Sequence, residues 1–198
     1  MKIEEGEKAV MRAREVIKSS VEGGKLSAPI LPRSFDELGG VFVTIESYPS
    51  RSLRGCIGFP EPTFPLKRAL DDAARSAALE DPRFPSVSLE ELDSITVEVT
   101  ILTPPTKLDC PPKEREKNIA IGVDGLIAQK GFYRGLLLPQ VPVEWGWDPE
   151  EFLSQTCVKA GLSPVAWLDD DTEIYKFQGD IFSEEKPSGD VKKRKIGG

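Results

Sequence analysis

The sequence contains no histidine, and this absence excludes more chemistry than any other feature of its composition. A Ser-His-Asp or Cys-His nucleophilic pair, a histidine general base and an HExxH zinc helix all need an imidazole from the chain. Chemistry carried by this chain must therefore use Cys, Asp, Glu, Lys, Arg or Tyr. The three cysteines Cys56, Cys110 and Cys157 are scattered without a CxxC pair, which favours free thiols and argues against a zinc site. We expect neither a bound metal nor a cofactor.

Long apolar runs are also missing. Even the longest runs, such as Gly135 to Val141, fall far short of the roughly 20 apolar residues that a helix needs to cross a bilayer. Met1 is followed by a charged segment rather than by the apolar core of a signal peptide. We therefore expect a cytoplasmic protein without a membrane association.

The chain has fewer basic than acidic residues: 26 Lys and Arg against 33 Asp and Glu, which gives a formal net charge of -7. Nucleic-acid coats and membrane-surface proteins need a positive field, so this balance disfavours both classes. RNA binding stays a minority hypothesis, since it would need a local basic face lined with aromatic side chains. Phosphate-binding loops of the GxGxxG or GxxxxGK[ST] type are absent from the sequence as well.

The remaining composition, 39% hydrophobic and 30% charged over 198 residues, is typical of one domain or two intimate lobes with a real core. Hydrophobic periodicity predicts helices and strands in a mixed order, with strands arriving in hairpins rather than in regular βαβ units. The predicted class is α+β with a largely antiparallel sheet and packed helices. We predict a single domain over residues 1–185 and a disordered polar and basic tail over residues 186–198.

Several local signals place the elements along the chain. The predicted helices are Ile3–Val21, one from Thr63 with Thr63 as N-cap, and one after Asp148 ending at Gly161. The predicted strands are Val41–Ser47, Leu53–Phe59, an alternating strand from Ile95 to Ile101, the runs on both sides of Asp124-Gly125, a buried strand ending at Gln140, and residues 173–182. Ser88 and Glu91 have the spacing of a capping box. Cys157 falls on the apolar stripe of the third helix, where a free cysteine is expected in the core.

The stretch SLRGCIGFPEP, from Ser52 to Pro62, is the most suggestive in the chain. Alternation on a strand predicts that Arg54, Cys56 and Gly58 share one face, with Leu53, Ile57 and Phe59 facing the core. A guanidinium beside a thiol favours the thiolate, so Arg54 would lower the pKa of Cys56. Glycines at 55 and 58 would allow a ligand, or another stretch of backbone, to approach closely.

Several blocks of the sequence resemble one known family. They are FVTI, LRGCIGFPEP, DPRFPSV, EVTILTPP, IGVDGLI, GLLLPQVPVEWGW and FLSQTCVKAGL, and the resemblance covers roughly Val41 to Phe182. This order of blocks resembles the AMMECR family, named after a human chromosomal region linked to Alport syndrome and midface hypoplasia. Its microbial members are called protein A of the AmmeMemoRadiSam system. The resemblance implies an α+β fold of two unequal lobes around a cleft, with the LRGCIG segment as the functional site.

The resemblance also implies possible partners, because genes of this family lie beside, or fuse with, those for Memo-type and radical-SAM proteins. Candidate binding residues for the cleft, besides Arg54, Gly55, Cys56 and Gly58, are Asp81, Arg83, Gln140, Glu144, Trp145 and Trp147. Each has a structural explanation too: Asp81 could end a helix, Arg83 could pair with it on the surface, and the tryptophans could be core residues. Gln140 would need hydrogen-bond partners if it were buried.

Three functions fit these observations. One is a metal-free modification or group-transfer enzyme in which Cys56 is the nucleophile and Arg54 and Arg83 hold an anionic substrate. Another is an interaction module without chemistry of its own that binds a Memo-type or radical-SAM partner. RNA binding is the third. For Cys56 itself, a purely structural role as a small buried residue beside glycines stays open.

Overall fold

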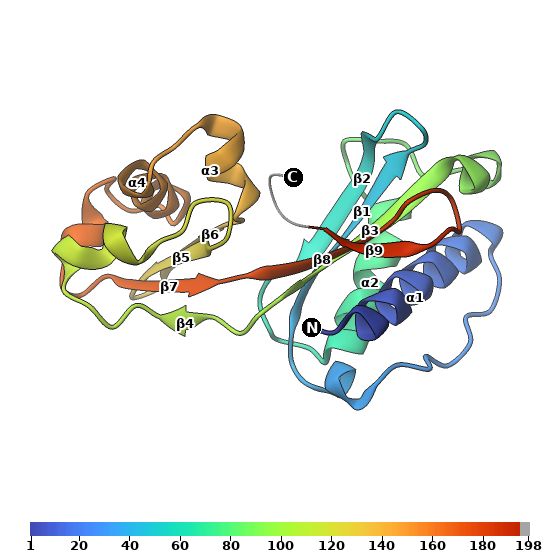
Figure 1. The fold of residues 1–198 in the computed structure, drawn as a ribbon, viewed down its shortest axis with the longest axis horizontal. Helices are drawn as coiled ribbons and strands as arrows, with labels where there is room; N and C mark the ends of the chain where they lie inside the picture. Colours follow the sequence, from blue (N-terminus) through green and yellow to red (C-terminus); the bar gives the residue numbers. More distant parts are fainter. Residues whose placement is uncertain (195–198) are drawn as a thin grey trace. The chain divides into compact units, whose positions relative to one another are not determined.

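The computed structural model describes residues 1–194, which divide into two compact units of helices and strands (Figure 1). Unit 1 comprises residues 1–102 and 180–194, and unit 2 comprises residues 103–179. Strand pairs with a defined register are antiparallel in both units, so the predicted α+β class is confirmed. Among residues 1–194, no helix has the length and apolar character needed to cross a bilayer.

Unit 1 is built on a five-stranded sheet whose order is β2-β1-β3-β8-β9. Its strands are β1 (Gly40–Ser47), β2 (Ser52–Phe59), β3 (Ile95–Leu102), β8 (Gly179–Glu184) and β9 (Val191–Arg194). Helices α1 (Ile3–Glu22) and α2 (Leu66–Leu79) pack against each other and against the sheet. Strand alternation sends one set of β-branched side chains into the core beneath these helices: Val41, Val43, Ile45, Val97 and Val99.

The polar residues between these core positions lie on the opposite face of the sheet. Thr44 and Glu46 on β1 and Thr96 and Glu98 on β3 form two adjacent rows, since Thr44 is opposite Glu98 and Glu46 is opposite Thr96. Cys56 on β2 is opposite Thr44 and extends the first row. The alternation in the sequence therefore separates a buried apolar face from a polar face that carries Cys56.

Short elements complete unit 1. They are the 3-10 helices η1 (Arg33–Asp36) and η2 (Leu89–Ser94). The predicted capping box is confirmed, because Ser88 and Glu91 cap the start of η2 reciprocally. The predicted N-cap Thr63 is wrong: α2 begins at Leu66 with Pro65 as the preceding cap, because proline tolerates the first turn but fixes the chain before it in an extended conformation.

Unit 2 contains a four-stranded sheet with the order β4-β7-β5-β6. Its elements are β4 (Thr106–Lys107), η3 (Pro112–Asn118), β5 (Gly125–Lys130), β6 (Tyr133–Leu137), α3 (Gln140–Trp145), α4 (Pro149–Lys159), η4 (Ala166–Leu168) and β7 (Glu173–Phe177). Helix α4 packs on β5 and β6. Asp148 caps α4 by accepting a hydrogen bond from the Glu151 N–H, as predicted, and Cys157 is buried in the core of this unit.

Three predictions in this region are wrong. Asp124-Gly125 is not a hairpin turn, because the buried Asp124 carboxylate accepts a hydrogen bond from the Ala120 N–H and closes a different turn. The strand predicted to reach Gln140 ends at Leu137, and Gln140 begins α3. Residues 173–182 form two strands in two sheets, β7 and β8, with Gln178 between them.

The predicted disordered tail is also corrected. Residues Val191–Arg194 form β9 and pair antiparallel with β8. A run of Lys and Arg carries no apolar pattern, but acidic partners hold it: Lys192 pairs with Glu185, Lys193 with Asp180 and Arg194 with Glu98. The rest of the predicted tail, residues 195–198, lies outside the described residues.

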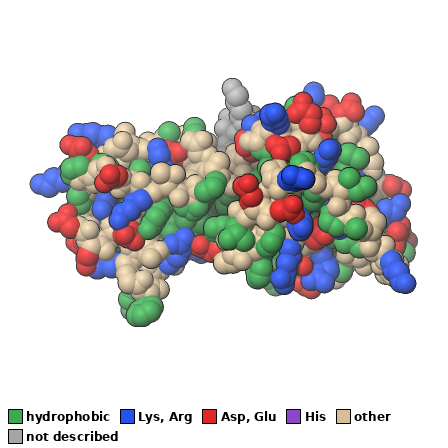
Figure 2. Space-filling model, turned by 90° about the horizontal axis from the view of Figure 1, so that it is seen from below, with side chains coloured by type: hydrophobic (Ala, Val, Ile, Leu, Met, Phe, Trp, Pro, Cys, Tyr) green, Lys and Arg blue, Asp and Glu red, His purple; other side chains and the backbone are tan. Residues whose placement is uncertain are grey.

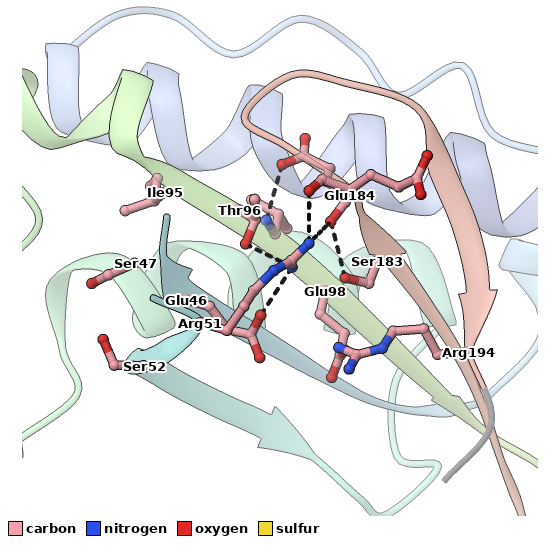
Figure 3. Close-up of polar contacts among 12 residues, drawn as sticks. Glu46, Ser47, Arg51, Ser52, Ile95, Thr96, Glu98, Ser183, Glu184 and Arg194 are labelled. Atoms are coloured by element: carbon pink, nitrogen blue, oxygen red, sulfur yellow. Dashed lines mark hydrogen bonds and ion pairs between the residues drawn. The ribbon is translucent and has the colours of Figure 1, made fainter. Parts of the chain in front are cut away.

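Arg51, in the turn between β1 and β2, connects this hairpin to the segment that follows β8. Its guanidinium donates hydrogen bonds to Glu46 and Thr96 on the polar face and to the backbone carbonyls of Glu184 and Glu185 (Figure 3). The β1–β2 hairpin, which carries Cys56, is therefore tied to the end of β8. This contact keeps the polar face of the sheet in a fixed arrangement.

Candidate functional site

Cys56 lies on β2, at the outer edge of the unit 1 sheet. Its thiol is half-buried, and the Thr44 hydroxyl on the neighbouring strand donates a hydrogen bond to its Sγ atom over 3.3 Å. Glu98 follows Thr44 in the same row across the sheet. Sheet register therefore supplies Thr44, the hydrogen-bond partner of the thiol, and a strand positions a side chain more rigidly than a loop would.

Asp81 and Arg83 form a clamp on the outer side of β2. The Asp81 carboxylate, 5% exposed, accepts the Cys56 N–H at 2.8 Å. It also accepts the Arg83 N–H and Nε at 3.0 Å each, and an Arg83 Nη at 2.8 Å. The same Nη group of Arg83 donates to the Cys56 carbonyl at 3.1 Å. Both outward-facing backbone groups of Cys56 are thus satisfied by two side chains from the DPRFP segment.

The clamp leaves part of the Arg83 guanidinium available. The Arg83 side chain is 53% exposed and lies over the Phe84 ring, with its Cζ atom 5.5 Å from the ring centre. Within residues 1–194, its second terminal nitrogen donates no hydrogen bond. The hydrogen bonds of this Arg83–Asp81 pair hold the pKa of the Asp81 carboxyl well below its usual range. The result is a fixed guanidinium edge beside Cys56.

The electrostatics at Cys56 favour the neutral thiol. Burial raises the pKa of Cys56, and the negative charges of Asp81 and Glu98 act in the same direction. The Thr44 hydrogen bond and the positive charge of Arg83 lower the pKa of Cys56 and offset part of this effect. The net direction is upward, so the thiolate is a minor form near neutral pH.

Arg54 does not have the role that alternation predicts for it. Ile45 pairs with Gly55 and Glu46 with Leu53, so Arg54 is the extra residue of a β-bulge. Its guanidinium donates to both carboxylate oxygens of Glu91, at 2.6 and 3.0 Å, and to the Pro85 and Ser86 carbonyls. The pKa of Glu91 is lowered to about 2 by these hydrogen bonds. Arg83, rather than Arg54, is the arginine that acts on the thiol.

The same bulge overturns the prediction for Leu53, which is largely exposed rather than in the core. The two glycines of the segment serve the protein's own packing. A Cβ atom on Gly55 would lie 2.3 Å from the Ala77 carbonyl oxygen of α2, and one on Gly58 would lie 2.2 Å from the Phe42 ring. Of the two alternatives that the sequence leaves open, close approach of the chain itself is the one the structure supports.

Sequence reasoning missed Thr44, Glu98 and Arg194. Arg194 donates a hydrogen bond to Glu98 at 3.0 Å across the polar face, where Figure 3 labels both side chains. Burial raises the pKa of Glu98, while the positive charge of Arg194 opposes that rise. The alternation of VFVTIES and SITVEVTIL marks Thr44 and Glu98 as polar-face residues, but the hairpin register was needed to place them beside Cys56.

The remaining predicted residues lie in unit 2. Gln140 is exposed at the start of α3, so it is not the buried amide that the sequence suggests. Glu144 is exposed on α3. Trp147 packs against the unit 2 core, and Trp145 stacks on it with ring centres 6.1 Å apart. Their role as substrate-binding residues stays a prediction.

In the part of the chain that the structure describes, no group of three or more Cys, Asp or Glu side chains is placed to hold a metal ion. The carboxylates near Cys56 already accept hydrogen bonds from arginines: Asp81 from Arg83, and Glu98 from Arg194. The group that this site leaves available to a ligand is therefore the Arg83 guanidinium and not a free carboxylate. Guanidinium donors are suited to hydrogen bonds with the oxygens of carboxylates and phosphates.

Comparison with known proteins places this chain in a family. A model of the AMMECR1 family matches residues 10–182. The chain belongs to the AMMECR1 family. Two AMMECR1 relatives are each 54% identical to it: a protein of Thermococcus gammatolerans, covering 99% of this chain and 98% of the relative, and Protein MJ0810 of Methanocaldococcus jannaschii, covering 98% and 97%.

A solved structure agrees with the fold of this AMMECR1 chain. The crystal structure of uncharacterized protein PH0010 from Pyrococcus horikoshii superposes with a TM-score of 0.84 at 52% identity, over 99% of both chains. The names of these relatives state neither a reaction nor a ligand. The function of this chain must therefore be inferred from the chemistry of Cys56, Asp81 and Arg83.

Proposed function

We propose that this AMMECR1 protein is a binding module that captures an oxyanion, a carboxylate or a phosphate, at Arg83 beside Cys56. One observation carries the proposal: the buried Asp81 carboxylate fixes Arg83 through its Nε and one Nη, while half of the Arg83 side chain stays exposed. A guanidinium held in one orientation loses little freedom when it binds an oxyanion. Cys56 lines this site as a neutral thiol.

The charge balance of the clamp sets the strength and character of binding. Asp81 neutralises the charge of Arg83, so long-range attraction of an anion is weak. The free N–H donors of Arg83 supply directed hydrogen bonds instead, and these favour a planar or tetrahedral oxyanion over chloride. The Phe84 ring beneath the guanidinium supports the same orientation.

The partner in this proposal is a protein or a small molecule that presents the oxyanion. The resemblance to protein A of the AmmeMemoRadiSam system suggests a Memo-type or radical-SAM protein, and we propose binding to such a partner through this site. A carboxylate side chain or a bound phosphate group of that partner would provide the anion. Enzymatic chemistry at Cys56 is not required by this function.

A thiol enzyme is the second candidate, and two contacts favour it. The Thr44 hydroxyl and the Arg83 guanidinium both stabilise a negative charge on Sγ. Burial, Asp81 and Glu98 oppose them and dominate. RNA binding has weaker support: the face drawn in Figure 2 shows acidic and basic side chains interspersed, without the continuous basic stripe that RNA contacts need.

The binding function can be tested through the melting temperature. Inorganic phosphate or succinate at about ten times its Kd should stabilise the protein by roughly 1.4 kcal/mol, a rise of about 3–5 °C. Arg83→Gln should abolish this rise, because the glutamine offers no guanidinium donors. The matched control is Arg75→Gln, which removes an exposed arginine of α2; within residues 1–194 its one ion pair, to Asp72, is long at 3.6 Å.

Sodium chloride at matched ionic strength separates specific binding from general salt effects. If sodium chloride raises the melting temperature as much as phosphate does, or if Arg83→Gln keeps the full rise, the proposed site is wrong. Retention of the rise in Arg75→Gln and its loss in Arg83→Gln would support the proposal.

A further inference from the structure

The turn between α3 and α4 in unit 2 exposes an aromatic surface that no contact within the described residues explains. Trp145 is 70% exposed, although tryptophan is among the side chains that gain most from burial. Its ring stacks on Trp147 with an angle of 19° between the planes, and Trp147 is anchored in the unit 2 core. Trp145 is therefore a supported platform rather than a loose side chain.

The backbone of this turn is built to present the platform. Helix α3 ends at Trp145, and Gly146 adopts a left-handed conformation with φ of 66° that residues with a side chain rarely take. The Gly146 and Trp147 N–H groups bond to carbonyls of the last turn of α3, namely those of Val143 and Pro142. These bonds close the helix and bring the two indole rings together.

The segment that carries Trp145 is acidic. Residues 140–151 contain Glu144, Asp148, Glu150 and Glu151, and contain no Lys or Arg. Within residues 1–194, neither Glu144 nor Glu150 forms an ion pair. No Lys or Arg side chain of these residues stacks on the Trp145 ring. At the start of α4, a cavity of about 250 Å³ is lined by Glu116, Lys117, Asp148, Pro149 and Glu150.

We propose that Trp145 and its acidic neighbours form a docking surface for a basic segment of a partner protein, with an Arg or Lys side chain over the Trp145 ring. Charge complementarity identifies this occupant, since the unpaired carboxylates repel an acidic segment and attract a basic one. The face of an indole ring is the strongest cation–π acceptor among the side chains. Tryptophan is also enriched among the residues that contribute most to the binding energy of protein interfaces. This surface would bind a cationic group, whereas Arg83 in unit 1 would bind an anionic one.

The test is fluorescence anisotropy with the full-length protein and three labelled dodecapeptides. One alternates arginine with glycine, one glutamate with glycine, and one serine with glycine. The basic peptide should bind, and the other two should not. Trp145→Leu should weaken binding of the basic peptide about tenfold, whereas Trp145→Phe should keep most of the affinity because it keeps an aromatic face. Phe132→Leu is the matched control, an exposed aromatic of unit 2 at the β5–β6 turn.

Each other outcome overturns the proposal. Equal binding to wild type and Trp145→Leu would mean that the net charge of -7 attracts basic peptides without a specific surface. Equal binding of the neutral peptide would mean that the surface is merely apolar. If sedimentation shows a wild-type dimer that Trp145→Leu dissociates, the occupant is a second copy of the chain. None of these results depends on Arg83, so failure here leaves the oxyanion site unaffected.

Discussion

Asp81→Asn is expected to lower the free energy of unfolding by roughly 2–4 kcal/mol and to abolish stabilisation by phosphate even though Arg83 is still present. The Asp81 carboxylate accepts hydrogen bonds from the Cys56 N–H and from three nitrogens of Arg83. An asparagine has the same shape, but its amide NH₂ group would face these donors. Arg83 would then lose the orientation on which oxyanion binding depends.

The control for this variant is Asp72→Asn on α2. Asp72 is a partly exposed carboxylate, and its ion pairs within residues 1–194, to Arg68 and Arg75, are both 3.6 Å long. Its replacement should change the free energy of unfolding by less than about 0.5 kcal/mol. Chemical denaturation of both variants measures the difference. An Asp81→Asn protein as stable as Asp72→Asn would show that the clamp adds nothing to the fold.

The effect of Asp81 should depend on pH in a defined direction. The fold lowers the pKa of Asp81 below its ordinary value of 3.8, so the folded state favours the ionised carboxylate. A carboxyl of this kind stabilises the fold above its ordinary pKa, and that contribution is lost as the pH falls below that value. The stability difference between wild type and Asp81→Asn should therefore be constant near neutral pH and shrink below about pH 4.

Gly55→Ala is expected to destabilise the protein by roughly 1–3 kcal/mol, because a methyl group there meets backbone rather than a movable side chain. The added Cβ atom would lie 2.3 Å from the Ala77 carbonyl oxygen, and both residues are buried between β2 and α2. Strand and helix would have to separate to accommodate it. The separation would also displace β2 and hence Cys56.

Gly24→Ala is the matched control. Gly24 follows α1, lacks a positive φ, and a Cβ atom there would meet nothing closer than the Ser19 hydroxyl at 3.5 Å. This substitution should be neutral or slightly stabilising, because alanine restricts the unfolded chain. If Gly55→Ala melts like Gly24→Ala but loses phosphate binding, Gly55 makes room for a ligand and not for α2.

The sequence predicted the framework of the site because that framework depends on local patterns. The hairpin that carries Cys56, the capping box at Ser88 and the Asp148 cap of α4 each follow from a few neighbouring residues. The same holds for the two faces of β1 and β3, where period-2 alternation separates core from polar residues. Membership of the AMMECR1 family was recognisable for a similar reason, since its blocks are contiguous.

The parts that could not be predicted depend on long-range contacts. A single bulge residue redirects Arg54 to Glu91, and no pattern in LRGCIG announces it. Strand β9 has no apolar alternation and is held by acidic partners distant in sequence, such as Glu98 for Arg194. A surface pair of Asp81 and Arg83 was one of the alternatives that the sequence left open, but the hydrogen bonds of both side chains to the Cys56 backbone were not predicted.

The rate of Cys56 alkylation as a function of pH tests most directly whether this site binds or reacts. Iodoacetamide labelling, followed by mass spectrometry of the separate cysteine peptides, reports Cys56 independently of Cys110 and Cys157. Cys157 is an internal slow reference, because burial raises the pKa of its thiol to about 11.

A binding site with a neutral thiol predicts slow labelling of Cys56 at pH 7, slower than a cysteine in an unstructured peptide. The rate should rise about tenfold per pH unit and level off only above the ordinary thiol pKa of 9.0. Rapid labelling at pH 7 with a plateau below pH 8 would contradict this account and establish Cys56 as an activated nucleophile.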